Sequence, residues 1–433
     1  MTPGRPVGDE AWSVRVPGDK SISHRALLFA ALASGESRLR GLLDGADPAS
    51  TASALRALGV AVPALAEAEV RIRGGGLHGL RPCDAPIDCG NSGTTARLLL
   101  GVLAGQAFPA TLTGDASLRR RPMRRVTEPL GRMGASVEEL GAPDRLPVRM
   151  TGGALRPLHH TSARASAQVK SALLLAGLTG GVAVSVREPA LSRDHTERLL
   201  RAMGAPVAVG VERGLPFAEI TPTQQLEPLD LDVPGDFSSA AYFIALGLLA
   251  REPLRINGVG LNPTRTGLLA VLERMGARVE VESATHAGEP AGDVVVYPAP
   301  LTATDVDGGE IPALIDEVPA LAVLAARAQG TTHIRGAGEL RVKESDRLAA
   351  LAGNLRALGV DAHDEGDELV VVGTDAPVRG TVRCHGDHRI AMAFGVLAAL
   401  PGNDIRIDDA DVVSISFPRF WAELQQAAHR VNP

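Results

Sequence analysis

Gly18–Gly35 reads GDKSISHRALLFAALASG, and this stretch decides the fold. After Arg25 the residues are apolar almost without interruption, so a helix here has no polar face to turn toward water. Such a helix is predicted to be enclosed by protein on every side. Its first turns nevertheless carry Lys20, Ser21 and Arg25, which need polar partners.

The same design recurs five more times along the chain. Each copy begins with a polar turn and becomes apolar nearly all round, and successive starts lie 72, 76, 69, 81 and 70 residues apart. The further copies are GNSGTTARLLLGVLAG from Gly90, SAQVKSALLLAGL from Ser166, GDFSSAAYFIALGLLA from Gly235, DEVPALAVLAARAQG from Asp316 and GDHRIAMAFGVLAAL from Gly386. We interpret the chain as six repeats of about 72 residues each.

A second kind of helix alternates with the enclosed ones. It ends in leucine or methionine followed by glycine, and Val126, Leu130 and Met133 show the one-sided spacing of an amphipathic helix. The glycine is predicted to form a left-handed C-terminal cap before a strand. The examples are LRALGV from Leu55, LGRMGASV from Leu130, LLRAMGAPV from Leu199, VLERMGARV from Val271 and LRALGVDA from Leu355. With β-rich runs such as ELVVVG between the helices, the pattern favours a compact α/β fold with three repeats in each of two domains.

The composition excludes several classes of protein. A chain of 433 residues is long for one core, and its net charge of −6 disfavours general attraction to nucleic acid or membranes. Aromatic residues make up only 3%, too few for base stacking along the arginine run LRRRPMRR. The three cysteines form neither a zinc pattern nor a disulfide framework. No apolar signal segment or membrane span is recognisable, so we expect a cytoplasmic protein without a metal site.

The polar starts of the enclosed helices are candidate anion sites. A helix N-terminus offers unpaired N–H groups and partial positive charge, and Lys20, Ser21 and Arg25 would add cations and a hydroxyl. Capped core helices whose basic side chains reach the surface are the alternative. The same two readings apply to GNSGTTAR, where Arg97 follows Gly93 by four residues.

Other motifs also leave two interpretations open. In SAQVK, polar residues at a helix start are either caps or ligands. In RVKESDR, either an anion sits between Lys343 and Arg347, or Glu344 pairs with Arg347. Asp316 is either an ordinary helix cap or a general base held among cations. In GDHR, Asp387 is predicted to be an N-cap, followed by two cationic residues where an anion would fit.

Lysine is rare in this chain. Lys20, Lys170 and Lys343 are its only lysines, and the other 41 of the 44 basic residues are arginine. All three lie at or beside polar motifs near helix starts. Because lysine carries a compact charge that it can lose, we infer that at least Lys20 and Lys343 are needed as ammonium groups.

Taken together, GDKSISHRA, GNSGTTAR, RRRPM, SAQVKSALLLAGL, RVKESDRL and GDHRIAMAF resemble the 5-enolpyruvylshikimate-3-phosphate (EPSP) synthase family, and the match spans nearly the whole chain. The resemblance implies an inside-out α/β barrel of six βαβαββ repeats, three in each of two domains. It places residues 19–235 in the N-terminal domain and residues 1–18 plus 236–433 in the C-terminal domain, with the active site in the cleft between them.

The resemblance also implies a reaction. The enolpyruvyl group of phosphoenolpyruvate would pass to the 5-hydroxyl of shikimate 3-phosphate through a tetrahedral intermediate, with release of phosphate and without metal or organic cofactor. The implied catalytic residues are Lys20, Asp316, Lys343 and Glu344. Asp316 would accept the hydroxyl proton, and either Glu344 or Lys20 would supply the proton to the methylene carbon.

The implied ligands divide into two sets. The shikimate 3-phosphate set is Lys20, Ser21, Arg25, Ser166, Ala167, Gln168, Arg193, Asp316 and Lys343. The phosphoenolpyruvate set is Lys20, Asn91, Gly93, Arg121, Gln168, Arg347, His388 and Arg389. SAQVKSA and SRDHTE are similar to the class II branch, and Gly93 leaves room for glyphosate to compete with phosphoenolpyruvate. SISFPRF lacks the lysine that some members carry before FP, and with it the phosphate contact that this lysine would make.

Three other functions compete with this one. A UDP-N-acetylglucosamine enolpyruvyl transferase usually has a loop cysteine, whereas this loop reads GDASLRRRPM. A non-catalytic phosphometabolite sensor would not need both Asp316 and Glu344. An RNA-binding protein is disfavoured by the acidic net charge. We expect small-molecule substrates, no nucleic-acid or membrane partner, and a monomer.

Overall fold

The computed structural model describes residues 12–286 and 288–432, which separate into two compact units. Unit 1 contains the described residues of Met1–Pro17, Pro234–Thr285 and Pro290–Pro433, and unit 2 contains Gly18–Val233 and His286–Glu289. Residues 1–11, which the sequence analysis assigns to the C-terminal domain, lie outside the described residues. Each unit has its own apolar core, as expected for a chain of this length.

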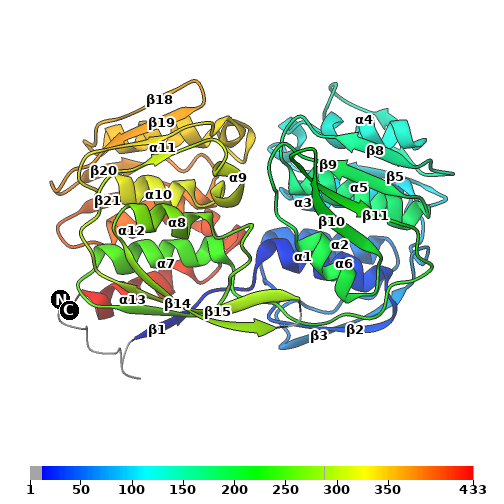
Figure 1. The fold of residues 1–433 in the computed structure, drawn as a ribbon, viewed down its shortest axis with the longest axis horizontal. Helices are drawn as coiled ribbons and strands as arrows, with labels where there is room; N and C mark the ends of the chain where they lie inside the picture. The colour runs from blue at the N-terminus through cyan, green and yellow to red at the C-terminus, as the bar shows by residue number, and fades with distance from the viewer. Residues whose placement is uncertain (1–11, 287, 433) are drawn as a thin grey trace. The chain divides into compact units, whose positions relative to one another are not determined.

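The six apolar stretches form enclosed helices, which confirms that prediction. From the first or second turn onward nearly every residue in them is buried. Within each unit the enclosed helices contact one another, and α3 packs along α5 (Figure 1). In unit 2 they are α1 (Lys20–Leu32), α3 (Gly93–Ala104) and α5 (Ala167–Gly180), and in unit 1 they are α7 (Phe237–Leu249), α10 (Val318–Ala325) and α12 (His388–Ala398).

Glycine allows the close approach of α3 to α5. A Cβ atom on Gly101 would lie 2.1 Å from the carbonyl oxygen of Ala172, so no larger residue fits there without moving a backbone. Small residues on enclosed helices therefore set the distance between them, and that distance fixes where the polar helix starts lie.

The second set of helices also forms as predicted. Each is followed by a glycine with positive φ, from 81° to 110°, which is the left-handed cap expected from the sequence. These glycines are Gly59, Gly134, Gly204, Gly276 and Gly359. The helices are α2 (Ala46–Ala57), α4 (Arg124–Met133) and α6 (His195–Ala202) in unit 2, and α8 (Gly267–Arg274) and α11 (Arg347–Ala357) in unit 1.

Three sheets are present among the described residues of unit 2. Each contains one parallel strand pair and at least one antiparallel pair. Their strand orders are β12-β2-β3, β4-β5-β7-β6 and β10-β11-β9-β8. The strands are β2 (Ser34–Arg40), β3 (Glu69–Gly75), β4 (Ile87–Asp88), β5 (Pro109–Thr113), β6 (Ser136–Glu139), β7 (Val148–Thr151), β8 (Leu158–Thr161), β9 (Val184–Arg187), β10 (Val207–Glu212), β11 (Leu215–Ile220) and β12 (Asp230–Asp232).

The described part of unit 1 also has three sheets, ordered β1-β13-β15-β14, β16-β17-β19-β18 and β20-β21. The strands are β1 (Ser13–Arg15), β13 (Leu254–Gly260), β14 (Arg278–His286), β15 (Glu289–Tyr297), β16 (Asp305–Val306), β17 (Thr331–Ile334), β18 (Ala362–Glu365), β19 (Glu368–Val372), β20 (Arg379–Val382) and β21 (Asp404–Ile407). The remaining helices are α9 (Ile311–Leu314) and α13 (Phe420–Val431), with 3-10 turns η1 (Leu118–Arg120) in unit 2 and η2 (Gly338–Val342) and η3 (Asp411–Ile415) in unit 1.

Strand pairing explains two of the places where the chain passes from one unit to the other. Parallel strands need a long crossover, and enclosed helices supply it in β4-α3-β5, β8-α5-β9, β16-α10-β17 and β20-α12-β21. In the two remaining parallel pairs the partners are exchanged. The strand before α1, β1, pairs with β13, which follows α7, and the strand before α7, β12, pairs with β2, which follows α1. The chain therefore changes unit after Pro17 and after Val233.

Candidate active site

Lys20 is the first residue of α1, as the sequence indicated for the polar helix start. The N-cap is Asp19, whose carboxylate accepts a hydrogen bond from the amide of Ile22. The Lys20 ammonium lies 3.1 Å from the carboxylate of Asp47 in α2, and both side chains are largely buried. The ammonium is thus held at the helix start by a carboxylate from a neighbouring helix.

Arg25 lies one turn further along α1 and is buried. Its guanidinium donates to the carbonyl of Ser21 at 2.9 Å, to the hydroxyl of Thr196 at 2.7 Å and to the hydroxyl of Ser171 at 2.9 Å. Burial lowers the pKa of Arg25 to about 10, Glu197 partly offsets this, and the charge of Arg193 contributes to the lowering. Arg193, a predicted ligand in the loop before α6, therefore lies in the electrostatic surroundings of Arg25.

The start of α3 gathers several predicted residues. Asn91 accepts a hydrogen bond from Arg121 at 2.5 Å and donates to Asp115 at 2.6 Å. A Cβ atom on Gly93 would lie 2.9 Å from an Nη1 atom of Arg97 and 3.3 Å from that of Arg121. The Gly93 backbone is therefore close to two guanidinium groups, which suits an anion.

The start of α5 meets the start of α3 through Gln168. Its amide oxygen accepts from Arg97 at 2.6 Å, and its amide nitrogen donates to the hydroxyl of Thr94 at 3.0 Å. Ser166 occupies the N-cap position of α5, but its side chain makes no capping hydrogen bond, and its main-chain N–H donates to Glu188 at 2.7 Å. Ala167 is the first helical residue, and because its methyl side chain has no polar atom, it can offer only backbone hydrogen bonds to a ligand.

In unit 1 the central group is the guanidinium of Arg347, the first residue of α11. It lies 2.6 Å from Glu344, 2.8 Å from Asp387 and 3.3 Å from Asp316, and its side chain is 1% exposed. Burial lowers its pKa, but Asp387 and Glu344 outweigh that effect and hold the pKa above its usual value. Glu344 therefore pairs with Arg347, the second of the two arrangements considered from the sequence.

Asp316 is not the cap of α10. The residue before that helix is Glu317, which makes no side-chain capping bond, and Asp316 lies one residue earlier. Its carboxylate lies 3.3 Å from Arg347 and 3.6 Å from Arg389, and the side chain keeps 13% exposure. The cap interpretation was wrong because the helix begins two residues later than its polar start, which leaves Asp316 among cations.

Arg389 and His388 open α12. Asp387 is the N-cap, as predicted, because its carboxylate accepts from the amide of Arg389 at 3.0 Å. The Arg389 side chain donates to the carbonyl of Asp316 at 3.4 Å. Burial lowers the pKa of Arg389, but Asp316 and other nearby anionic groups hold it well above its ordinary value. His388 is buried beside it.

Lys343 lies just after η2, next to Glu344. Removal of water by the surrounding protein lowers the pKa of its ammonium from 10.5 to about 8, with Asp316 and Glu339 opposing the shift. An amine with this pKa carries its charge at neutral pH and can lose it in mildly basic solution.

Sequence reasoning missed several supporting residues. Asp47 and Thr196 hold Lys20 and Arg25, respectively, yet they lie 27 and 171 residues away from them. No local pattern signals such partners, since they come together only when helices pack. Asp387 was recognised as a cap, and its second role, an ion pair with Arg347 across 40 residues, was not.

Two properties of the described residues bear on the kind of site. Among the described residues, no cluster of three or more His, Cys, Asp or Glu side chains could hold a metal ion. Nor does any helix in the described part of the chain have the length and apolar character to cross a membrane.

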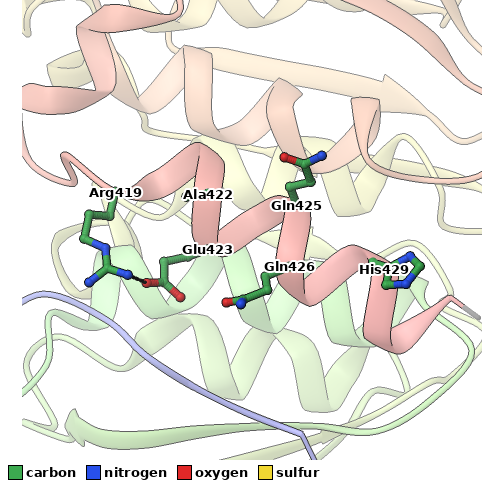
Figure 2. A pocket seen from close by; sticks show the side chains of 6 residues that line it. All are labelled: Arg419, Ala422, Glu423, Gln425, Gln426 and His429. Carbon is green, nitrogen blue, oxygen red and sulfur yellow. Dashed lines mark ion pairs between the residues drawn. The ribbon is translucent and has the colours of Figure 1, made fainter.

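A surface depression on unit 1 runs along α13, where Arg419 pairs with Glu423 at 3.1 Å (Figure 2). No predicted site residue lines it.

The arrangement can bind anions and move protons. Unit 2 offers Lys20, Arg25 and Arg121 with polar partners at helix starts, and unit 1 offers two partly exposed carboxylates, Asp316 and Glu344, beside cationic groups. Guanidinium and ammonium groups suit phosphates and carboxylates. Carboxylates and an amine of shifted pKa suit general acid–base catalysis.

Known proteins resemble this chain over nearly its full length. The family described as "EPSP synthase (3-phosphoshikimate 1-carboxyvinyltransferase)" matches residues 7–424. A protein named 3-phosphoshikimate 1-carboxyvinyltransferase from Synechococcus sp. (strain WH7803) is 48% identical over 417 residues, covering 95% of this chain and 94% of its own. One of the same name from Acidithiobacillus ferrooxidans (strain ATCC 53993 / BNL-5-31) is 48% identical over 426 residues, covering 98% and 96%.

Solved structures agree with the sequence relatives. EPSP synthase from Acinetobacter baumannii has a TM-score of 0.82 and 38% identity, with 98% of this chain and 96% of that chain covered. The enolpyruvyl transferase NikO from Streptomyces tendae has a TM-score of 0.76 at 23% identity, covering 96% and 94%, and shares the fold. The chain belongs to the EPSP synthase (3-phosphoshikimate 1-carboxyvinyltransferase) family.

Proposed function

We propose that this protein transfers the enolpyruvyl group of phosphoenolpyruvate to the 5-hydroxyl of shikimate 3-phosphate and releases phosphate. The observation that carries the proposal is the cluster of Asp316, Glu344 and Arg347 with Arg389 and Lys343 beside it. It combines proton-transfer groups with anion-binding groups, and both are needed to add a hydroxyl to an anionic enol ester.

Shikimate 3-phosphate is proposed to bind mainly to unit 2. Arg25, Ser21 and Arg193 would contact its anionic groups, and Lys20 would lie between the two substrates. The starts of α5 and α1 would contribute backbone amides, because helix N-termini favour phosphate and carboxylate. The complete proposed set is Lys20, Ser21, Arg25, Ser166, Ala167, Gln168, Arg193, Asp316 and Lys343.

Phosphoenolpyruvate is proposed to bind where guanidinium groups are most concentrated. Arg121 with the Gly93 backbone in unit 2 and Arg347 with Arg389 in unit 1 match its phosphate and carboxylate, since both groups accept paired N–H donors. The complete proposed set is Lys20, Asn91, Gly93, Arg121, Gln168, Arg347, His388 and Arg389. The reaction requires both sets to reach one pair of substrates.

The proposed mechanism is addition followed by elimination. Asp316 accepts the proton of the 5-hydroxyl, assisted by the neighbouring Lys343, and the oxygen adds to the central carbon of phosphoenolpyruvate. Glu344 or Lys20 protonates the methylene carbon, which produces a tetrahedral intermediate. Loss of phosphate and of a methyl proton then restores the double bond.

Substrate binding can prepare Glu344 for this role. Its carboxylate lies 2.6 Å from Arg347, a residue also proposed to bind phosphoenolpyruvate. If the anionic substrate takes over the guanidinium, the carboxylate loses its counter-ion, and the protonated form becomes more favourable. This coupling would load the acid only when the substrate is present.

The finer architecture is part of the proposal. The three sheets and three enclosed helices of each unit support six βαβαββ repeats arranged as an inside-out α/β barrel, three per domain. The domains would be residues 19–235 and residues 1–18 plus 236–433, within two residues of the unit boundaries at Pro17 and Val233. A cytoplasmic monomer that needs no cofactor fits this function.

The test is phosphate release from phosphoenolpyruvate with and without shikimate 3-phosphate. We expect release only when both are present, and no release when UDP-N-acetylglucosamine replaces the acceptor. Asp316→Asn and Glu344→Gln should each lower kcat by at least about 100-fold, in the range of general acid–base contributions. Release with the nucleotide sugar, or none with shikimate 3-phosphate, would overturn the proposal.

A further inference from the structure

Lys170 has no part in the proposed chemistry, yet it is one of only three lysines in the chain. It lies in the first turn of α5, and its side chain is 3% exposed. The ammonium contacts Glu197 at 2.8 Å, Glu188 at 3.1 Å and the carbonyl of Ser192 at 3.3 Å. Three acceptors around one nitrogen match the three N–H bonds of an ammonium group.

Glu188, which follows β9, joins two segments of the proposed shikimate 3-phosphate site. One carboxylate oxygen accepts the main-chain N–H of Ser166 at 2.7 Å, which fixes the start of α5. The other accepts the hydroxyl of Ser192 at 2.6 Å as well as the Lys170 ammonium. Because Arg193 follows Ser192 directly, the same carboxylate anchors the chain that carries this predicted ligand.

Glu197 connects Lys170 to Arg25 through neighbouring residues. Lys170 and Ser171 are adjacent on α5, and Thr196 and Glu197 are adjacent on α6. The ion pair of Lys170 with Glu197 lies beside a 2.7 Å hydrogen bond between Ser171 and Thr196. Those two hydroxyls accept hydrogen bonds from Arg25, so the ion pair holds α5 and α6 at the spacing that the Arg25 guanidinium requires.

The ammonium of Lys170 offsets the negative charge of Glu188 and Glu197, which are buried beside it. One ammonium meets two buried carboxylates, and although burial lowers the pKa of Lys170, Glu197 and Glu188 raise it above its ordinary value. The remaining negative charge also acts on Arg25, because Glu197 opposes the lowering of the Arg25 pKa by burial. The cation of Lys170 therefore permits two carboxylates to stay buried behind an anion site.

Among the described residues, the contacts of the network lead to the shikimate 3-phosphate set. They lead to Ser166, to the residue before Arg193 and to the hydroxyls that hold Arg25. Ser166, Arg193 and Arg25 are all proposed for shikimate 3-phosphate. On the phosphoenolpyruvate side, Arg121 is held by Asn91, which is held in turn by Asp115. The described supports of the two sets therefore differ, except at Gln168, which lies in the first turn of α5 and is proposed for both sets.

We propose that Lys170, with Glu188 and Glu197, is a positioning group for shikimate 3-phosphate: it fixes the start of α5, the loop carrying Arg193 and the side chain of Arg25 in one arrangement. This inference rests on the proposed function. It assigns Lys170 no contact with substrate. Arginine would not replace it, because a planar fork cannot direct N–H bonds to acceptors on three sides of one nitrogen.

The test compares Lys170→Met and Glu188→Gln with a control that weakens the same core elsewhere. Ile72→Ala in β3 is the control, since Ile72 is fully buried in the core of unit 2 and lies on an element that carries none of Lys170, Glu188 and Glu197. For each variant, steady-state phosphate release gives KM for both substrates, calorimetry gives the Kd of shikimate 3-phosphate, and thermal unfolding gives Tm.

We expect KM and Kd for shikimate 3-phosphate to rise at least about tenfold in both network variants, with less than about a twofold change in KM for phosphoenolpyruvate. Ile72→Ala should lower Tm without this split. If Lys170→Met does not fold, Glu188→Gln and Glu197→Gln carry the same measurement. Equal changes in both KM values, or a lowered Tm with unchanged Kd, would show a merely structural role. A wild-type protein that releases no phosphate would overturn the proposed function, and this assignment with it.

Discussion

The ammonium of Lys343 predicts a specific pH dependence of activity. Because burial lowers its pKa to about 8, the group is mostly protonated at pH 7 and mostly neutral at pH 9. If the reaction needs the cation beside Asp316, kcat/KM should fall about tenfold for each pH unit above about pH 8. An unburied lysine would not cause a decline until more than two pH units higher.

The same shift has a consequence for stability. The folded chain releases its proton near pH 8 and the unfolded chain near 10.5, so the unfolded state binds more protons between these values. The Lys343 contribution to the free energy of unfolding therefore rises with pH across this window. Its full size is about 3 kcal/mol, at 1.36 kcal/mol for each pH unit. Activity should thus fall where this contribution to stability rises, which separates the loss of charge from unfolding.

The assay is phosphate release from pH 7 to pH 10, where both substrate phosphates are already doubly ionised, with urea unfolding at each pH. Lys343→Arg is the matched variant, because its guanidinium keeps its charge throughout this range. We expect lower activity in this variant at pH 7 and no decline centred near pH 8. A decline at the same pH in Lys343→Arg, or constant wild-type activity up to pH 10, would refute the reasoning.

Three other substitutions test the site. Arg347→Met should lower the free energy of unfolding in urea by about 3–5 kcal/mol, because it leaves buried carboxylates without their shared cation; an unchanged midpoint would contradict the cluster. Gly93→Ala should raise KM for phosphoenolpyruvate and weaken competitive inhibition by glyphosate, because the added Cβ meets Arg97 at 2.9 Å; equal inhibition of both proteins would count against this. Lys20→Arg should reduce turnover at saturating substrates at least tenfold, and near-normal turnover would reject the need for a compact ammonium at this position.

Much of the fold follows from short-range features of the sequence. An uninterrupted apolar run such as Ala26–Ala33, which forms most of α1, indicates a buried element, since no face of it tolerates water. A glycine after the last leucine, as at Gly59, indicates where an amphipathic helix ends, because it adopts positive φ at low cost. The regular spacing of these signals predicts the repeats without knowledge of any contact.

The candidate ligands could also be found from sequence, because basic and polar residues gather at the starts of the enclosed helices, where helix N-termini favour anions. Their partners could not. Arg25 depends on Thr196, 171 residues away, and Arg347 depends on Asp387, 40 residues away. Hydrogen bonds of this kind depend on which helices pack together, and no local spacing records that.

The amino-acid sequence by itself determined which segments are helices, which helices are enclosed, and which side chains stand at their polar starts. Only the tertiary structure decided that β1 and β12 exchange sheets, that Asp316 faces two arginines instead of capping α10, and that Lys170 meets two buried glutamates. The physical reason is one of range. Helix formation, burial of apolar runs and glycine caps act within about one turn of the chain, whereas a buried charge selects whichever opposite charge the packing of distant helices brings within about 3 Å.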